Sequence, residues 1–234
     1  MPPEAAAAVS PYTRANPFPG KLVVNRRLSG EESEKDTRHF EVDLAGWGLS
    51  YEVGDSMAVY PSNDPALVEE LVHALCAKGD ETVPGNKGQE TTLREALLHD
   101  YRITQTTPKF LKAIAQRASG APLLNELLQP ERKADLDSYL WGLEVIDFVL
   151  EHPSVRFTPA EFVALLAKLQ PRLYSISSSL KAHPEAVHFT IDVVGYESHG
   201  RQRKGVCSSF LAERCEKNPV PVFPNTSKFR LPQD

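Results

Sequence analysis

Apolar and polar positions alternate with a period of two in three segments, which predicts half-buried β-strands. In the first segment, Phe40, Val42 and Leu44 alternate with acidic residues. The other two segments run over residues 51–59 and 187–193. Proline and glycine separate the segments, as is usual in an antiparallel sheet or a small barrel.

Over residues 64–170 the apolar spacing changes to that of amphipathic helices. Asp64 is followed by Pro65 and by an apolar stripe from Leu67 to Leu75, which predicts a capped helix. Further helix starts are predicted at Thr92, Thr107 and Thr158, each followed by apolar residues at helical spacing. Several short helices are therefore expected between two β-rich regions.

The order of these segments predicts a mixed β and α chain in four parts. We expect a disordered tail over residues 1–16, because five of the 19 prolines and an alanine run fall in the first 20 residues. Residues 17–63 and 171–234 are expected to form the two parts of one antiparallel β-barrel. Residues 64–170 are expected to form an all-α insertion between them.

Composition and charge narrow the class of protein. The 234 residues are 41% hydrophobic and 24% charged, as in an ordinary globular protein. The net charge of −5 argues against nucleic acid as a partner. No apolar run approaches the roughly 20 residues that a membrane-spanning helix needs, and the first residues lack the features of a signal peptide.

The spacing of the cysteines predicts the cellular compartment of the protein, and the spacing of the histidines predicts that it binds no metal. Cys76, Cys207 and Cys215 form an odd set without C-x-x-C spacing, so we expect free thiols in the cytoplasm. The seven histidines show no spacing typical of metal ligands, so no bound metal is expected.

A first candidate binding segment is Arg172-Leu173-Tyr174-Ser175. Residues two apart in a strand face the same way, so Arg172 and Tyr174 can meet one ligand. A guanidinium group pairs with phosphate oxygens, and a tyrosine ring offers a flat face to a heteroaromatic ring. The simpler alternative is a strand aromatic beside a serine-rich turn.

A second candidate segment runs over residues 204–211, where Gly205 precedes a predicted helix start. Glycine lets the backbone approach a ligand, and the free N–H groups of a first helical turn favour a phosphate. The alternative is an ordinary strand–turn–helix junction. No base is paired in the sequence with Cys207, so a small semi-buried thiol is preferred over the nucleophile of a cysteine-dependent hydrolase.

A third candidate is a basic loop in an otherwise acidic chain. Its members are Tyr196, His199, Arg201, Arg203 and Lys204. An anionic ligand and a solvated hairpin tip explain this loop equally well.

Five sequence blocks, in this order, resemble the FAD-binding domain of the ferredoxin-reductase superfamily. More narrowly, they resemble the diflavin reductases, in particular the NADPH-dependent sulfite reductase flavoprotein branch. The blocks are YEVGDSMAVYPSND at 51–64, RLYSISSS at 172–179, VHFTIDVVGYE at 187–197, KGVCSSFLAER at 204–214 and SKFRLP at 227–232. The resemblance implies an antiparallel FAD-binding β-barrel interrupted by an all-α connecting insertion.

The resemblance also implies a role for each matching residue. Arg172 is expected to contact the FAD pyrophosphate and Tyr174 to stack on the isoalloxazine ring. Ser175 is expected to hydrogen-bond near the flavin N5 atom, which makes it the expected catalytic residue. The other expected FAD contacts are Leu173, Thr190, Ile191, Asp192, Tyr196 on the adenosine side, Gly205, Val206, Cys207 and Ser208 at the pyrophosphate, and Thr104 in the insertion.

The function implied by the resemblance is that of an NADPH-dependent oxidoreductase. NADPH gives hydride to FAD, which passes electrons to FMN or to a haem partner such as the sulfite reductase haemoprotein. The chain shows no glycine-rich nucleotide-binding fingerprint. We therefore expect the NADPH-binding domain to be absent and the chain to be truncated or excised. The alternatives are another diflavin-type NADPH–haemoprotein reductase and a non-catalytic interaction module with a decayed cofactor site.

Overall fold

The computed structural model describes residues 12–48, 50–118, 121–216 and 218–228, and these residues form two compact units. The sheet unit holds the described parts of Met1–Pro61, Pro171–Val194 and Cys207–Asp234. The helical unit holds those of Ser62–Gln170 and Gly195–Val206. Each unit has its own hydrophobic core.

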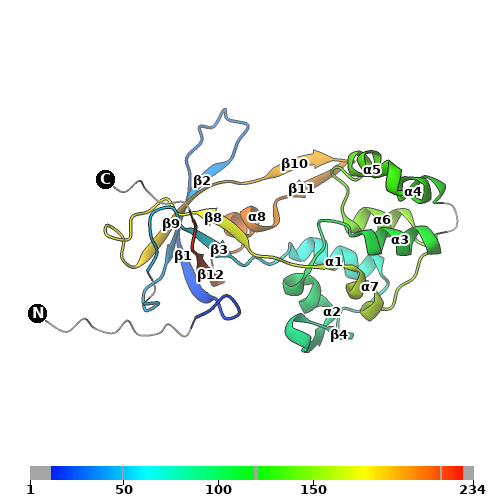
Figure 1. Ribbon diagram of the computed structural model, residues 1–234, viewed down its shortest axis with the longest axis horizontal. Helices are drawn as coiled ribbons and strands as arrows, with labels where there is room; N and C mark the ends of the chain where they lie inside the picture. Colours follow the sequence, from blue (N-terminus) through cyan, green and yellow to red (C-terminus); the bar gives the residue numbers. More distant parts are fainter. Residues whose placement is uncertain (1–11, 49, 119–120, 217, 229–234) are drawn as a thin grey trace, which may run out of the picture. The chain divides into compact units, whose positions relative to one another are not determined.

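Six strands of the sheet unit form one antiparallel sheet in the order β8-β3-β12-β1-β2-β9 (Figure 1). The strands are β1 (Phe18–Arg27), β2 (Thr37–Asp43), β3 (Ser56–Val59), β8 (Arg172–Ser175), β9 (Ala186–Asp192) and β12 (Val220–Asn225). Helix α8 (Val206–Glu213) adds Phe210 and Leu211 to the core of this unit. Segments from both ends of the chain thus share one sheet.

The predicted antiparallel sheet is confirmed, but its ladder does not close into a barrel among the described strands. Strands β8 and β9 form the two ends of the ladder. Just beyond β8, the N–H of Ser177 donates to the carbonyl of His188 at 3.0 Å, and the hydroxyl of Ser178 accepts from the N–H of His188 at 3.1 Å. These two bonds join the turn after the four-residue strand β8 to β9.

The two-residue alternation predicted β2 and β9 correctly. Phe40, Val42, Val187 and Phe189 are fully buried, and the two strands pair directly. These four buried side chains are the apolar positions of the alternation, and for this reason the alternation predicts these two strands.

The strand predicted over residues 51–59 is wrong in its first half, because β3 begins only at Ser56. Gly54 has a φ of 95°, a left-handed conformation that favours glycine. The carboxylate of Asp55 accepts a hydrogen bond of 2.9 Å from the N–H of Glu52. These residues form a turn before the strand.

The predicted tail also differs in its last part. Residues 1–11 lie outside the described part of the chain, whereas residues 12–16 form a turn. Thr13 and Asn16 exchange two backbone hydrogen bonds of 2.9 Å. The ring of Tyr12 meets that of Phe18 edge-on at 4.9 Å, which ties this turn to the core.

The helical unit is mostly α-helical. Its α-helices are α1 (Pro65–Ala74), α2 (Leu93–Glu95), α3 (Pro108–Arg117), α4 (Pro122–Leu127), α5 (Lys133–Tyr139), α6 (Val145–Glu151) and α7 (Pro159–Leu165). Two 3-10 turns, η1 (Asn86–Gly88) and η3 (Pro130–Arg132), and one π-helical turn, η2 (Ala96–Asp100), complete the set. The prediction of an all-α insertion is wrong, because residues 64–170 contain two of the three two-stranded ladders of this unit. The third ladder comes from residues 195–204, which were expected in the barrel. These ladders are β4 (Thr82–Pro84) with β5 (Glu90–Thr92), β6 (Tyr101–Arg102) with β7 (Ala167–Lys168), and β10 (Gly195–Ser198) with β11 (Arg201–Lys204).

The helix starts follow the predicted capping residues. Asp64, Thr107 and Thr158 each accept a hydrogen bond from a backbone N–H in the first turn of the following helix. Thr92 does the same, but α2 has only three residues before the chain continues as η2. These caps fix where the helices begin and therefore which side chains enter the core.

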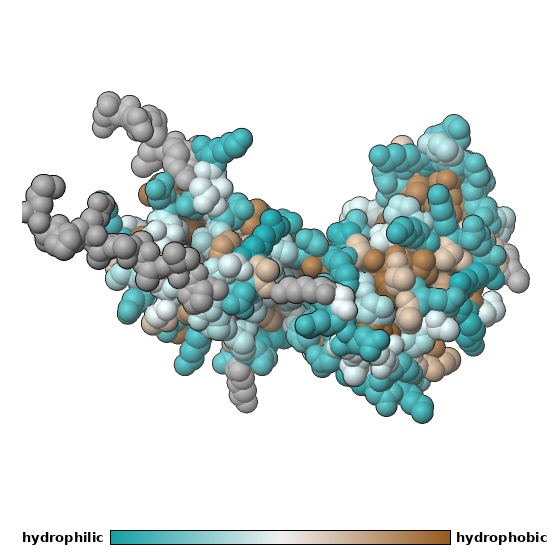
Figure 2. Space-filling model, turned by 60° about the horizontal axis from the view of Figure 1, so that its bottom comes forward, coloured by the Kyte–Doolittle hydropathy of each residue, from teal (hydrophilic) through white to brown (hydrophobic). Residues whose placement is uncertain are grey.

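The surface shows small apolar patches, in brown, between hydrophilic residues, in teal (Figure 2). In the helical unit, Leu123, Trp141 and Leu150 are exposed large apolar side chains. Among the described helices, none has the length and apolar character needed to cross a membrane.

Candidate cofactor site

The Arg-x-Tyr-Ser segment forms β8, an end strand of the sheet that pairs with β3. Arg172, Leu173 and Ser175 are exposed, and Tyr174 is half-buried. Within the described ranges, no carboxylate forms an ion pair with Arg172, unlike most other arginines of the chain. The Arg172 guanidinium is therefore available to an anionic ligand.

Tyr174 is anchored on the core of the sheet unit. Its ring lies 6.1 Å from the ring of Phe189, and its hydroxyl is hydrogen-bonded with the thiol of Cys207. Burial raises the pKa of Tyr174 well above its usual range, so the phenol is neutral at any physiological pH. A ring held in this way offers a fixed apolar face.

Cys207 lies in the first turn of α8 and is 6% exposed. Its Sγ atom is 3.9 Å from the carbonyl oxygen of Val59, and it also contacts Tyr174 and the backbone of Arg172. Burial raises the pKa of Cys207 to about 12, so the thiol is protonated at neutral pH. A protonated thiol is a poor nucleophile, which supports the structural interpretation of this residue over the hydrolase.

Ser208 connects α8 with the end of β9. Its side chain is buried, and its hydroxyl accepts a hydrogen bond of 3.1 Å from the N–H of Val194. The hydroxyl is thus used within the fold. We expect a phosphate contact at this point from backbone N–H groups in the first turn of α8.

Strand β9 carries three more of the expected residues. Thr190 and Asp192 are exposed, whereas the side chain of Ile191 is 5% exposed and belongs to the core. Ile191 can therefore offer a ligand only its backbone. The sheet unit thus brings Arg172, Tyr174 and Cys207 into contact and places residues 190–192 on the strand that holds Phe189.

The remaining expected residues belong to the helical unit, namely Thr104, Tyr196, Gly205 and Val206. Tyr196 lies on β10 with 42% of its surface exposed, and its ring is 5.9 Å from that of Trp141. Trp141 is 68% exposed, which is unusual for so large an apolar residue. The sequence analysis did not single out Trp141, which stands before Gly142 and after helix α5.

The basic loop is the β10–β11 hairpin, and its charges are paired with acidic residues of its own unit. Arg203 is 2% exposed, and its two terminal nitrogens lie 2.8 Å from Asp147 and 3.4 Å from Glu144, both on or just before α6. The other ion pairs of the hairpin are Arg201–Glu70, Arg201–Asp147 and Lys204–Asp64. The tip of the hairpin, His199 and Gly200, is exposed, as the solvated alternative predicts, and an anionic ligand at this hairpin stays a prediction.

The Glu144 carboxyl makes the stability of the chain dependent on pH. Burial raises the pKa of Glu144 to about 7, although Arg203 opposes the shift. The folded chain therefore keeps a proton that the unfolded chain releases near pH 4.5, so this stabilisation is complete below pH 4.5 and is lost as the pH rises through about 7. We expect this group to lower the free energy of unfolding by up to about 3 kcal/mol between about pH 4.5 and pH 8.

Urea unfolding at about pH 5 and about pH 8 measures this effect. In Glu144→Gln the corresponding part of the pH dependence should disappear, because the amide does not titrate. An unchanged difference between the two pH values in this variant contradicts the assignment.

The exposed residues of the sheet unit fit a ligand that carries both phosphate and an aromatic ring. Arg172 has no ion pair among the described residues, and its guanidinium suits a phosphate, while the anchored ring of Tyr174 offers a flat apolar face to an aromatic ring. With the antiparallel sheet and the helical insertion, these features define the class of flavin-binding modules.

The chain belongs to the FAD binding domain family, whose family model matches residues 10–210. Three similar proteins are each named "Sulfite reductase [NADPH] flavoprotein alpha-component". The protein of Bacillus subtilis (strain 168) is 43% identical over 228 residues, that of Escherichia coli O9:H4 (strain HS) 41% over 230, and that of Mannheimia succiniciproducens 40% over 226.

The alignments cover 96% of this chain for the Bacillus protein and 95% for the other two. They cover only 38% of the Bacillus protein and 37% of the others. The chain thus spans less than two fifths of the length of these curated relatives.

Of the five sequence blocks, residues 229–232 of the last one lie outside the described part of the chain.

Proposed function

We propose that this chain is the FAD-binding portion of an NADPH-dependent oxidoreductase of the sulfite reductase flavoprotein type. The observation that carries the proposal is the exposed Arg172, unpaired among the described residues, beside the anchored ring of Tyr174. This pair of residues lies in a chain of the FAD binding domain family, and the similar proteins are named as sulfite reductase flavoproteins. Bound FAD supplies a ring system that accepts a hydride and releases electrons singly.

In the sheet unit, the residues divide between the two ends of the cofactor. Arg172 holds the pyrophosphate, together with backbone N–H groups of Cys207 and Ser208 at the start of α8. Tyr174 supports the isoalloxazine ring, and the hydroxyl of Ser175 hydrogen-bonds at N5 as the catalytic residue. The remaining proposed contacts of this unit are Leu173, Thr190, Asp192 and the backbone of Ile191.

The local electrostatics favour an anion at Arg172. Tyr174 and Cys207, which lie near its guanidinium, both have raised pKa values and stay neutral at physiological pH. No negative charge from these groups competes with the pyrophosphate for the guanidinium. The full charge of Arg172 is thus directed at the cofactor.

In the helical unit, the proposed contacts rest on the resemblance to the family. They are Thr104, Gly205, Val206 and Tyr196, and we add Trp141 because its exposed ring lies against that of Tyr196. We further propose residues 17–63 and 171–234 as the two parts of the FAD-binding barrel, with residues 64–170 as the connecting insertion. NADPH is the proposed electron source, an FMN domain or a haemoprotein the proposed acceptor, and the cytoplasm the proposed compartment.

The proposal is tested by FAD binding to Arg172→Ala. We expect the wild-type chain to bind FAD in near-stoichiometric amount, with a flavin absorption spectrum. Loss of a charge-assisted hydrogen bond should weaken FAD binding by about 10- to 100-fold in the variant. Fluorescence titration of the cofactor-free chain, with chromatography of the released flavin, measures both quantities.

The matched control is Arg26→Ala, which removes an exposed arginine from β1 in the same unit. We expect FAD binding of this variant to equal that of the wild type. A folded wild-type chain that takes up no FAD contradicts the proposed function and supports the non-catalytic module. Equal FAD binding by Arg172→Ala and Arg26→Ala contradicts the proposed pyrophosphate contact.

A further inference from the structure

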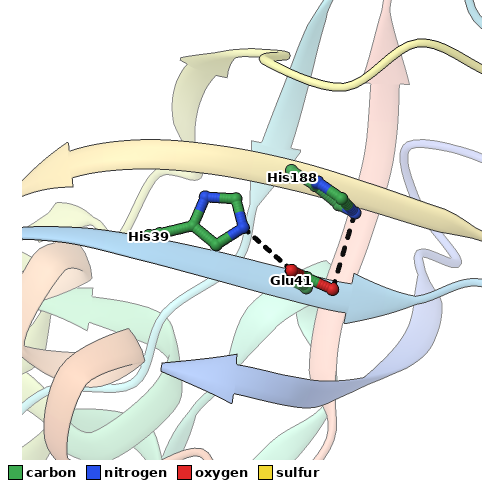
Figure 3. Close-up of side chains that lie close together, drawn as sticks. All are labelled: His39, Glu41 and His188. Carbon is green, nitrogen blue, oxygen red and sulfur yellow. Dashed lines mark hydrogen bonds and ion pairs between the residues drawn. The ribbon is translucent and has the colours of Figure 1, made fainter. Parts of the chain in front are cut away.

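Two histidines and a glutamate gather on one face of the neighbouring strands β2 and β9 (Figure 3). Glu41 stands directly opposite His188 in the strand register, and His39 lies two residues before Glu41. Residues two apart in a strand share a face, so all three side chains lie on the side opposite the buried Phe40 and Val42.

The donor atoms of these side chains face one another. Nε2 of His39 is 2.9 Å from one carboxylate oxygen of Glu41, and Nε2 of His188 is 3.6 Å from the other. One donor atom of each residue lies within 4.8 Å of the other two. The three side chains therefore form a compact group of nitrogen and oxygen donors.

His188 supplies an independent sign of a missing ligand. It is 8% exposed, and among the described residues its Nε2 atom has no hydrogen-bond partner. Buried polar atoms in proteins are nearly always hydrogen-bonded, and an unsatisfied one is costly. A metal ion bound to this nitrogen removes that cost.

The surroundings hold the group in place. The serine-rich turn after β8 binds the backbone of His188 through Ser177 and Ser178. The same turn brings the ring of His183 to 4.3 Å from that of His188.

We propose that His39, Glu41 and His188 bind one divalent ion of the Zn²⁺ type. The ligands are Nε2 of each histidine and the carboxylate of Glu41, with water in the fourth position. Two imidazoles and one carboxylate are an established donor set for Zn²⁺, with bond lengths of about 2.0–2.2 Å.

The ion would cross-link two adjacent strands of the sheet. Strand β9 is an end strand, and a ligand that binds only the folded chain stabilises it by mass action. Zn²⁺ is thus expected to raise the melting temperature of the chain. This inference rests on the sheet unit alone and is independent of the proposed FAD site.

The test is a Zn²⁺ titration of the tag-free chain after removal of metals by a chelator. A chromophoric chelator that competes for Zn²⁺ reports both the affinity and the stoichiometry. We expect one Zn²⁺ per chain, and binding at least about tenfold weaker in Glu41→Gln and in His39→Gln. Both residues are partly exposed, so the variants should fold, and circular dichroism checks this.

Two matched controls exclude other donors. His99→Ala removes a histidine from a surface pair with Glu95, 3.7 Å apart, and Cys76→Ser removes the exposed thiol. Both controls should bind Zn²⁺ as the wild type does. The proposal is overturned if the wild type binds no stoichiometric Zn²⁺, if the two folded cluster variants keep wild-type affinity, or if a control loses as much as they do.

Discussion

Replacing Arg203 by glutamine is expected to lower the free energy of unfolding by about 3–5 kcal/mol at about pH 8, above the pKa of about 7 of its partner Glu144. The guanidinium is 2% exposed and pairs with Asp147 and Glu144, whose side chains are 13% and 10% exposed. Removing the cation leaves two buried carboxylates without their counter-charge. Urea unfolding of wild type and variant measures the difference.

The pH dependence distinguishes this cause from a loss of packing. Glu144 has a pKa of about 7 in the wild type, and its neutral form needs no counter-charge. The loss in Arg203→Gln should therefore shrink at about pH 5, and it should be smaller in a double variant with Glu144→Gln. A loss that is equal at both pH values contradicts the ion-pair explanation.

Arg201→Gln is the matched control on the same strand. Its side chain is 31% exposed and pairs with Glu70 and Asp147 nearer to solvent. Partly exposed ion pairs contribute about 1 kcal/mol or less, so this variant should lose correspondingly little stability. Equal losses in the two variants would show that burial of Arg203 does not decide the effect.

Replacing Phe110 by alanine should also lower the free energy of unfolding by about 3–5 kcal/mol, because it removes a large side chain from a packed core. Phe110 is fully buried in α3. Its ring meets those of Phe148, Phe157 and Phe162 at centroid distances of 6.1–6.3 Å. The neighbouring helices cannot close the resulting cavity without moving these three rings.

Leu123→Ala provides the control for this substitution. Leu123 lies on α4 of the same unit and is 52% exposed, so its truncation should change the free energy of unfolding by no more than about 0.5 kcal/mol. Thermal or urea unfolding compares the two variants. A loss below about 1 kcal/mol in Phe110→Ala contradicts its place at the centre of the helical core.

The sequence predicted those parts of the structure that depend on interactions between residues close together along the chain. The alternation in β2 and β9 follows from residues two apart, and the caps at Asp64, Thr107 and Thr158 act within three residues of the cap. Where a local signal was mixed, the prediction failed. Residues 51–55 share the alternation of a strand but form a turn, because Gly54 and Asp55 favour one.

The candidate site could be read only in part. The Arg-x-Tyr-Ser segment was found because its residue types and their spacing suit a phosphate and a ring. That Arg172 is exposed and unpaired among the described residues, while Arg203 is buried and paired, follows from the positions of acidic residues far away in the sequence. The sequence alone does not distinguish the environments of these two arginines.

By itself, the sequence determined the alternation of the strands, the helix starts, and the segments whose residue types suit a phosphate-bearing cofactor. Each of these depends on residues close together along the chain. Only the tertiary structure decided that the sheet ladder stays open, that the basic hairpin pairs with α6, and that His188 meets His39 and Glu41. These features join residues far apart in sequence, and the packing within each unit that brings them together is fixed by its core rather than by local propensity.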